Sequence, residues 1–277
     1  MKPAIPDIST SDLPAAVIDI ARQASDRILE IYETDFTVEK KADRSPLTAA
    51  DMAAHHTICD GLSGLTPDLP ILSEESADIP YATRKSWSRY WLVDPLDGTR
   101  EFVKKNGEFT VNIALIQGHT PVLGVVYVPV SGLCYFASRG RGAYKQDPAH
   151  RVQRIHVKTT SPGKFVMAGS RSHGNEQQTR FIEVLGKGTE LIAIGSSMKF
   201  CLVAEGKVDI YPRFGPTSEW DTAAAHCIVD EAGGMVTDIG LNPLGYNKKE
   251  SLLNPGFLVI ADRHFNWQQY LKCVNNI

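Results

Sequence analysis

The pattern of apolar residues changes near residue 158, and this change is the strongest constraint on the fold. Apolar residues from Leu13 to Ile31 recur at steps of three and four, which predicts an amphipathic helix. A second helix is expected from about Thr48 to Gly61 or Gly64. The strands expected after it follow one another closely, at residues 69–73, 90–94, 111–117, 122–128 and 133–137.

Beyond residue 158, strands and helices alternate. The expected strands are residues 165–168, 191–194 and 208–211, and the expected helices are residues 175–185, 197–205 and 222–232. The last helix ends at the pair Gly233-Gly234, because glycine readily adopts the left-handed conformation of a helix C-cap. A strand-rich half followed by an alternating half predicts an α/β protein with two layered subdomains, residues 1–157 and 158–277.

Composition excludes several classes of protein. The chain has 277 residues, of which 43% are hydrophobic and 22% are charged, and these values are typical of a globular protein. Lys and Arg number 29 against 32 Asp and Glu, which gives a formal net charge of −3. A protein that coats nucleic acid would need a basic excess, so this class is excluded. A small anionic ligand is compatible with the balance, since it needs only a few local positive groups.

Cysteine usage and hydropathy predict a soluble protein in a reducing, cytoplasmic setting. The five cysteines form no CxxC pair, which disfavours a disulfide framework or a thiolate zinc site. Residues 1–13 are polar and contain proline, unlike a signal peptide. The longest apolar stretch, residues 122–130, is far shorter than the roughly 20 residues of a membrane span. A weak peripheral association with the cytoplasmic face of the inner membrane is left open.

A motif with two carboxylates ends the strand expected at residues 90–94. In WLVDPLDGT (residues 91–99), Asp94 and Asp97 follow three apolar residues, and Gly98-Thr99 could open a short helix. Two anions held this close are driven toward protonation unless a cation lies between them. The motif therefore indicates a metal site, and the alternative is an ordinary Asp/Gly turn.

Three further carboxylates accompany this motif. Glu74 directly follows the strand expected at residues 69–73, and Asp51 lies in the first turns of the second helix. Asp221 directly precedes the helix expected from Thr222, and taken alone it is more typical of an N-cap than of a metal ligand. Each residue has an ordinary structural explanation, but their combination with the DPLDGT motif in this order is much more specific.

This combination resembles the magnesium-dependent, lithium-sensitive phosphomonoesterases of the inositol monophosphatase superfamily. The matching segments are SPLTAAD (45–51), WLVDPLDGTREF (91–102), NGEFTVNIALI (106–116), GSSMKFCLVAEG (195–206), YPRFGPT (211–217) and WDTAAAHCIVDEAGG (220–234). The run GTREF (98–102) departs from the GTTNF-like run of inositol monophosphatases and is similar to the 3′(2′),5′-bisphosphate nucleotidase branch. The resemblance implies a layered αβαβα sandwich, as in inositol monophosphatases and fructose-1,6-bisphosphatases.

The resemblance also implies a metal site and a mechanism. The implied ligands are Glu74, Asp94, the backbone carbonyl of Leu96, Asp97 and Asp221. These donors are hard oxygens, which favours Mg²⁺ over Zn²⁺, and about two or three ions are expected. The implied reaction is an in-line attack of water on phosphorus, without a covalent intermediate. Thr99 paired with Asp51 is placed to help take the proton of this water, with Glu74 as the other catalytic carboxylate.

Substrate contacts are implied in both halves of the chain. If Gly98 and Thr99 open a helix, their N–H groups suit a phosphate. The other implied contacts are Asp221, Ser196, Lys199 and Arg213, with His173 as a softer candidate. Taken alone, Lys199 lies on an otherwise apolar helix and could instead extend its ammonium to solvent.

The resemblance implies hydrolysis of adenosine 3′,5′-bisphosphate to AMP and phosphate, which would recycle the by-product of sulfate assimilation. The first alternative is an inositol monophosphatase-like phosphomonoesterase. The second is a catalytically silent nucleotide-binding relative, which would be expected to lose a residue of the motifs. All six of these residues are present, namely Asp51, Glu74, Asp94, Asp97, Thr99 and Asp221, and their presence favours an enzyme.

Overall fold

Two β-sheets organise the chain. The computed structural model describes residues 12–34, 46–170 and 176–271. Within these residues, the first sheet contains seven strands in sequence order. They are β1 (Ile71–Ser73), β2 (Arg89–Asp97), β3 (Thr110–Gln117), β4 (Thr120–Val128), β5 (Leu133–Ser138), β6 (Gly142–Gln146) and β7 (Val152–Ile155). Strand β1 pairs in parallel with β2, and every later pair is antiparallel.

The second sheet mixes parallel and antiparallel pairs. Its described strands follow the order β11 (Met235–Asp238), β12 (Phe257–Ile260), β10 (Ile210–Arg213), β8 (Val166–Ser170) and β9 (Glu190–Ile194). Strand β12 is antiparallel to both of its neighbours, whereas β10, β8 and β9 run parallel. The crossovers between parallel strands contain helices, as parallel pairing requires.

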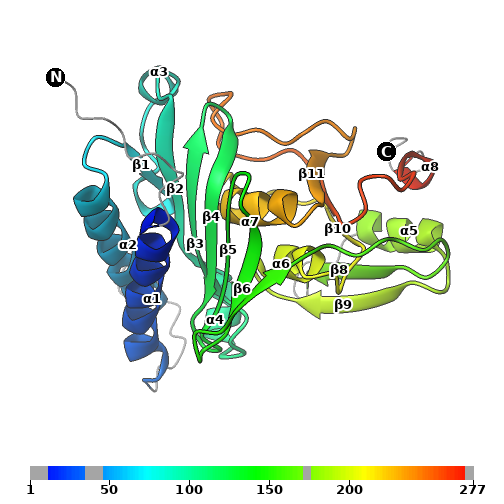
Figure 1. Cartoon of the computed structure of the whole chain (residues 1–277), viewed down its shortest axis with the longest axis horizontal. Helices are drawn as coiled ribbons and strands as arrows, with labels where there is room; N and C mark the ends of the chain where they lie inside the picture. The colour runs from blue at the N-terminus through cyan, green and yellow to red at the C-terminus, as the bar shows by residue number, and fades with distance from the viewer. Residues whose placement is uncertain (1–11, 35–45, 171–175, 272–277) are drawn as a thin grey trace.

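Helices complete a layered arrangement (Figure 1). Helices α1 (Asp12–Tyr32) and α2 (Pro46–Leu65) cover the outer face of the first sheet. Helices α6 (Met198–Ala204) and α7 (Trp220–Glu231) lie between the two sheets, and α5 (Glu176–Leu185) and α8 (Gln268–Leu271) lie beyond the second sheet. The short helical segments η1 (Glu74–Ser76) and α3 (Tyr81–Arg84) connect β1 to β2, and α4 (Thr99–Val103) follows β2.

The alternation of side chains along β2 connects two of the hydrophobic cores. Trp91 and Val93 pack with α1 and α2, whereas Tyr90 and Leu92 pack with α6 and α7 on the opposite face. This period of two is expected for a strand that is covered on both faces. The end of β2 is thereby held rigidly between two helical layers.

Helix α7 lies unusually close to the first sheet. A Cβ atom added at Gly124 on β4 would lie 2.1 Å from the carbonyl oxygen of Ala224 on α7. Glycine at this position and the alanines Ala223–Ala225 on the helix therefore permit the close packing. The start of α7 carries Asp221, so this contact helps to set the position of the site.

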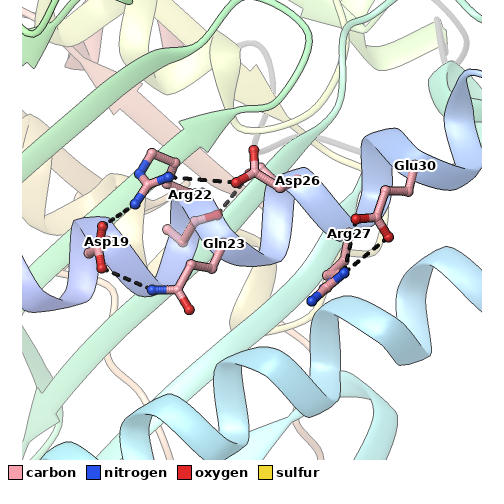
Figure 2. A network of polar contacts seen from close by, with 8 residues as sticks. Asp19, Arg22, Gln23, Asp26, Arg27 and Glu30 are labelled. Atoms are coloured by element: carbon pink, nitrogen blue, oxygen red, sulfur yellow. Dashed lines mark hydrogen bonds and ion pairs between the residues drawn. The ribbon is translucent and has the colours of Figure 1, made fainter.

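The exposed face of α1 carries ion pairs at regular helical spacings (Figure 2). Arg22 contacts Asp19 and Asp26, and Arg27 contacts Glu30, at the i,i+3 and i,i+4 spacings of a helix surface. These exposed ion pairs contribute little stability each. The buried face of α1, with Val17, Ala24 and Ile28, provides the packing that fixes the helix.

Several sequence expectations are confirmed and some are corrected. The described strands and helices include all of those expected. Strand β2 continues to Asp97 instead of ending at Asp94, because Pro95 and Leu96 form a bulge within the strand. Helix α7 begins at Trp220, so Asp221 lies inside the helix instead of preceding it.

The subdomain boundary at residues 157 and 158 stays a proposal. The first sheet ends at Ile155 and the second begins at Val166, but α7 packs on both sides of this division. Cys59, Cys134, Cys201 and Cys227 are free thiols, and Cys273 lies outside the described residues. Over the same described ranges, no helix combines the length and hydropathy needed to cross a membrane.

Candidate active site

A cavity of about 270 Å³ lies beside the end of β2. Its lining comes from both halves of the chain: the segment Asp97–Glu101, the loop before α6, helix α6, strands β10 and β12, and the start of α7. The predicted site residues among this lining are Asp97, Gly98, Thr99, Ser196, Lys199, Arg213 and Asp221. The structure thus brings together residues that are separated by more than a hundred positions in the sequence.

Four carboxylates, Glu74, Asp94, Asp97 and Asp221, lie close to one another, and Asp97 and Asp221 line this cavity. Asp94 is buried, and its pKa is raised well above the ordinary value by burial and by the neighbouring charges of Asp97, Glu74, Asp221 and Asp51. Burial and the charge of Asp97 raise the pKa of Asp221 to about 7. Glu74 is exposed as a residue, but partial desolvation and its acidic neighbours also raise its pKa. All four residues therefore repel one another when ionised.

Asp97 is held by polar side chains that the sequence reasoning did not identify. The Ser197 hydroxyl lies 2.9 Å from Asp97 Oδ2 and 2.8 Å from the backbone oxygen of Asp221. Asn112 Nδ2 donates to Ser197 Oγ at 3.0 Å, and both Asn112 and Thr110 lie 3.5 Å from Asp97 Oδ2. Burial raises the pKa of Asp97, while Lys199 and these hydrogen bonds oppose the rise.

The sequence contains a pattern that could have identified two of these residues, Thr110 and Asn112. Thr110 and Asn112 are polar residues two apart in the otherwise apolar strand β3, so they share one face. In the β2–β3 register, Asn112 stands opposite Asp94 and Thr110 stands opposite Asp97. Buried polar residues that alternate along a strand therefore mark the face on which the carboxylates lie.

The interpretation of Asp221 as an N-cap is wrong. Glu219 occupies the cap position of α7, and Asp221 is the second helical residue. Its Oδ2 accepts a hydrogen bond from the backbone N–H of Ser218 at 3.0 Å. A short loop thus precedes the helix, and the Asp221 carboxylate lines the cavity together with Asp97.

Asp51 joins the acidic group from α2. It is 7% exposed, and burial followed by the charges of Glu75 and Glu74 raises its pKa to about 8. Its Oδ1 has no hydrogen-bond partner among the described residues. Thr99 begins α4 and lines the cavity, but the structure shows no hydrogen bond between Thr99 and Asp51. Their pairing stays a prediction.

The other side of the cavity carries two cations. Lys199 is 6% exposed, so the interpretation that its ammonium extends to solvent is wrong. Its Nζ donates to the backbone oxygens of Ser196, at 2.6 Å, and of Ile194, at 3.4 Å. Burial lowers its pKa from 10.5 to about 8, although Asp97 favours the charged form. Arg213 is half-buried, and its Nη2 donates to the Pro216 carbonyl at 3.1 Å.

The remaining predicted residues occupy distinct places. Leu96 is buried within β2, and Gly98 has a φ of 99° at the start of α4, where a Cβ would lie 3.1 Å from the Glu108 carbonyl oxygen. Ser196 also has a positive φ, of 46°, and its buried hydroxyl has no partner in the described part of the chain. His173 falls outside the described residues.

The donor set fits a hard divalent cation. Among the residues that the structure describes, no group of three or more His, Cys, Asp and Glu side chains is arranged as a ready metal site. The chemistry of the carboxylates nevertheless fits one, since their raised pKa values reflect burial and repulsion that a bound cation relieves. Their donors are all oxygens, which suits Mg²⁺. The ligand assignment stays a proposal.

Comparison with known proteins places this chain in a family. A family model described as the inositol monophosphatase family matches residues 10–269. The protein named 3′(2′),5′-bisphosphate nucleotidase CysQ from Escherichia coli (strain K12) is 52% identical over 246 residues, which are 88% of this chain and 97% of that protein. The protein of the same name from Haemophilus influenzae is 36% identical over 257 residues, which are 92% of this chain and 95% of that protein.

Solved structures agree with the sequence comparison. CysQ from Bacteroides thetaiotaomicron, described as a bacterial member of the inositol monophosphatase family, has a TM-score of 0.85 at 46% identity and covers 93% of this chain and 100% of its own. An inositol monophosphatase from Zymomonas mobilis shares the fold, with a TM-score of 0.78 at 23% identity over 96% of this chain and 99% of its own. The predicted αβαβα layering is confirmed. This chain belongs to the inositol monophosphatase family.

Proposed function

We propose that this protein is a Mg²⁺-dependent 3′(2′),5′-bisphosphate nucleotidase that hydrolyses adenosine 3′,5′-bisphosphate to AMP and phosphate. One observation carries the proposal: two of the repelling carboxylates, Asp97 and Asp221, line the same cavity as the two cations Lys199 and Arg213. An enzyme for a substrate with two phosphates needs two kinds of phosphate site. The relatives that are about half identical to this chain carry this activity in their names.

The carboxylates provide the metal site of the proposal. Mg²⁺ ions, about two or three in number, would be held by Glu74, Asp94, the carbonyl of Leu96, Asp97 and Asp221. When bound, Mg²⁺ supplies positive charge that offsets the phosphate and makes the attacking water more acidic. Ser197 and Asn112 keep the Asp97 carboxylate in place for this role.

Asp51 is the residue suited to take the proton of the attacking water. Its buried Oδ1 is unpartnered within the described chain, and burial with the charges of Glu75 and Glu74 raises its pKa, so a bound cation would favour the ionised form that accepts a proton. Thr99 lines the cavity, and its hydroxyl would pass the proton from water to Asp51 Oδ1. Threonine alone is a poor base, so Asp51 must draw the proton through it. Glu74 is the other carboxylate that could serve.

The two cations bind the part of the nucleotide that does not react. The 3′-phosphate lies against the carboxylates and their metal, with Gly98 and Thr99 beside it. The second phosphate is recognised by Lys199 and Arg213, with Ser196 beside them, and His173 belongs to the same proposal. Inositol monophosphate carries no second phosphate and does not need these contacts. In the cytoplasm, this selectivity would recycle the by-product of sulfate assimilation.

A phosphate-release assay tests the proposal directly. Purified protein is given adenosine 3′,5′-bisphosphate, inositol 1-phosphate or fructose 1,6-bisphosphate, with Mg²⁺, with a chelator, or with the chelator followed by excess Mg²⁺. We expect the adenosine bisphosphate to be hydrolysed far faster than the others, no activity with chelator, and recovery with Mg²⁺. Li⁺ should inhibit by competition for a Mg²⁺ position.

Each alternative predicts a different pattern in this assay. Preference for inositol 1-phosphate would replace the proposal with an inositol monophosphatase-like activity. Tight nucleotide binding without hydrolysis of any substrate would indicate a silent relative. Full activity in chelator would contradict the metal site.

A further inference from the structure

A buried arginine fastens two distant segments behind the acidic group. Arg84, at the end of α3, is 2% exposed. Its Nη1 donates to Asn247 Oδ1 at 2.5 Å, and its Nη2 donates to the Glu250 carbonyl. In return, Asn247 Nδ2 donates to the Arg84 carbonyl at 2.7 Å. The connection between β1 and β2 is thereby fixed to the loop between β11 and β12.

A neighbouring contact strengthens the same attachment. The Tyr81 hydroxyl, one turn before Arg84, donates to the Lys248 carbonyl at 3.0 Å. The Arg84 guanidinium carbon also lies 5.0 Å from the centre of the Tyr81 ring. Tyr81 and Arg84, the first and last residues of α3, therefore both contact the same short segment, residues 247–250.

Asn247 also connects this segment to the start of α7. Its backbone N–H donates to Glu219 Oε2 at 2.8 Å, and both residues are 2% exposed. Asn247 has a φ of 53°, a left-handed conformation that asparagine adopts more readily than most residues. Glu219 is the cap residue of α7, and its carbonyl accepts hydrogen bonds from the N–H groups of Thr222 and Ala223. We call Arg84, Asn247 and Glu219 the clasp.

The residues that follow Glu219 belong to the acidic group. Trp220 lies beside the Glu74 carboxylate and lowers its pKa, and Asp221 lines the cavity. Glu74 itself lies in the β1–β2 connection, ten residues before Arg84. The clasp therefore joins the connection that carries Glu74 to the helix that carries Asp221, and it does so from outside the cavity.

A buried charged network of this kind fixes the relative positions of the segments that it joins more than it stabilises the fold. Desolvation of a guanidinium and a carboxylate largely cancels their mutual attraction, so apolar residues of similar shape would stabilise the fold about as well. Their directional hydrogen bonds, however, permit a single arrangement of the joined segments. Such support is what a site of mutually repelling carboxylates requires.

We propose that Arg84, Asn247 and Glu219 are positioning residues that fix Asp221 relative to Glu74 and thereby set the affinity of the site for Mg²⁺. This inference rests on the proposed function, since it takes Glu74 and Asp221 as metal ligands. None of the three clasp residues lines the cavity, so the clasp acts only through the residues that it holds.

The test measures Mg²⁺ binding to metal-free protein by calorimetry, without substrate. Asn247→Gly removes both side-chain bonds to Arg84 but keeps the positive φ and the N–H that reaches Glu219. Arg84→Lys keeps the charge and removes the forked geometry. We expect each variant to weaken Mg²⁺ binding about tenfold, the effect typical of residues that orient metal ligands. Asn247→Asp, which keeps the acceptor for Arg84, should lose less.

A second measurement separates position from stability. Nucleotidase activity of the variants, plotted against Mg²⁺ concentration, should shift to higher concentration by the same factor and regain the unmodified plateau at saturation. The matched control is Leu185→Ala, in the outer core beyond the second sheet, which lowers the thermal unfolding temperature without touching the clasp. This control should bind Mg²⁺ normally. Should Asn247→Gly fail to fold, Arg84→Lys and Asn247→Asp carry the comparison.

The outcomes distinguish the clasp from the proposed function. If the unmodified protein hydrolyses the bisphosphate and binds Mg²⁺, but the folded clasp variants bind it equally well, the clasp proposal alone is overturned. It is also overturned if Leu185→Ala weakens Mg²⁺ binding as much as Asn247→Gly does. If the unmodified protein binds no Mg²⁺, the proposed metal site fails, and the clasp proposal fails with it.

Discussion

The acidic side and the cationic side of the cavity are built on opposite principles. The acidic side gathers carboxylates whose pKa values are raised by burial and by one another, namely Asp51, Glu74, Asp94, Asp97 and Asp221. The cationic side holds its charges against backbone carbonyls: Lys199 donates to Ser196 and Ile194, and Arg213 donates to Pro216. The carboxylates of the acidic side repel one another, whereas the charges of the cationic side are already hydrogen-bonded to backbone carbonyls.

This difference shows which side depends on an added ion. Lys199 lowers the pKa of Asp97, and Arg213 lowers that of Asp221, whereas the charges with the largest effect on the pKa of Asp94 are all carboxylates. The protein supplies too little positive charge to ionise the whole acidic group at neutral pH. A bound cation completes the acidic side, whereas the cationic side keeps its geometry without one. Substitutions should therefore affect catalysis on the first side and recognition on the second.

The largest effect is expected from Asp51→Asn. This change removes the proposed base and keeps the shape of the side chain, so turnover should fall by about 10²–10⁴, the usual range for a general base. Mg²⁺ binding, measured by calorimetry, should persist, because Asp51 is not among the proposed ligands. Near-normal turnover in this variant would move the base role to Glu74 or to the metal alone.

A smaller and more selective effect is expected on the cationic side. Lys199→Ala and Arg213→Ala should each raise KM for adenosine 3′,5′-bisphosphate about 10- to 100-fold, because a charge-assisted contact contributes roughly 1.5–3 kcal/mol. Steady-state kinetics with p-nitrophenyl phosphate provide the control, since this monoester has no second phosphate. Equal losses on both substrates would show that the two residues support the fold and do not recognise nucleotide. Lys199→Met, which fills the same space, guards against an effect of the cavity left by alanine.

The carboxylates of the acidic side could be predicted from the sequence, whereas the polar residues that hydrogen-bond to them could not. Asp94 and Asp97 follow a long apolar strand, so their place at the end of β2 could be read from the chain itself. Ser197 could not be found in this way, because its partner Asp97 lies 100 residues away and the neighbouring Ser196 has the same side chain. The two serines differ in backbone conformation, with a φ of 46° at Ser196 and −67° at Ser197, and this difference appears only in the fold.

The fold shows the same limit. Long apolar strands such as β3 and β4 were predicted to within two residues, whereas β6, β7, β11 and β12 were not predicted. Strands β6, β7 and β11 have four or five residues each and contain polar residues, so their own pattern is weak, whereas β12 is wholly apolar but only four residues long. Tertiary contacts decide their structure. Likewise, local preference predicted a helix that begins at Thr222, directly after Asp221, but α7 begins two residues earlier, at Trp220.

The pair Ser197→Ala and Ser196→Ala sharpens the comparison at the junction of the two sides. Ser197 bridges Asp97 and the Asp221 backbone, so its loss should weaken Mg²⁺ binding about tenfold. Ser196 makes no such bridge, and its removal should leave Mg²⁺ affinity unchanged while altering KM for the bisphosphate. Calorimetric titration of both metal-free variants checks the first statement. Equal Mg²⁺ affinities in the two variants would contradict the role given to Ser197.

The smallest effect, a severalfold change with pH, tests whether the cationic side needs its charge. Burial lowers the pKa of Lys199 from 10.5 to about 8, so at pH 9 about one molecule in ten keeps the proton. Since kcat/KM reports the free enzyme, its value for the bisphosphate should fall severalfold from pH 7 to pH 9 relative to that for p-nitrophenyl phosphate.

Stability changes in the opposite sense, because the unfolded chain holds this proton up to about pH 10.5. The contribution of Lys199 to the free energy of unfolding therefore rises between pH 8 and pH 10.5. Alkaline unfolding would lower both quantities together, and chemical denaturation at each pH separates the two cases. In Lys199→Met the ratio of the two kcat/KM values should no longer depend on pH, and a constant ratio in the unmodified protein would show that the charge of Lys199 does not bind the second phosphate.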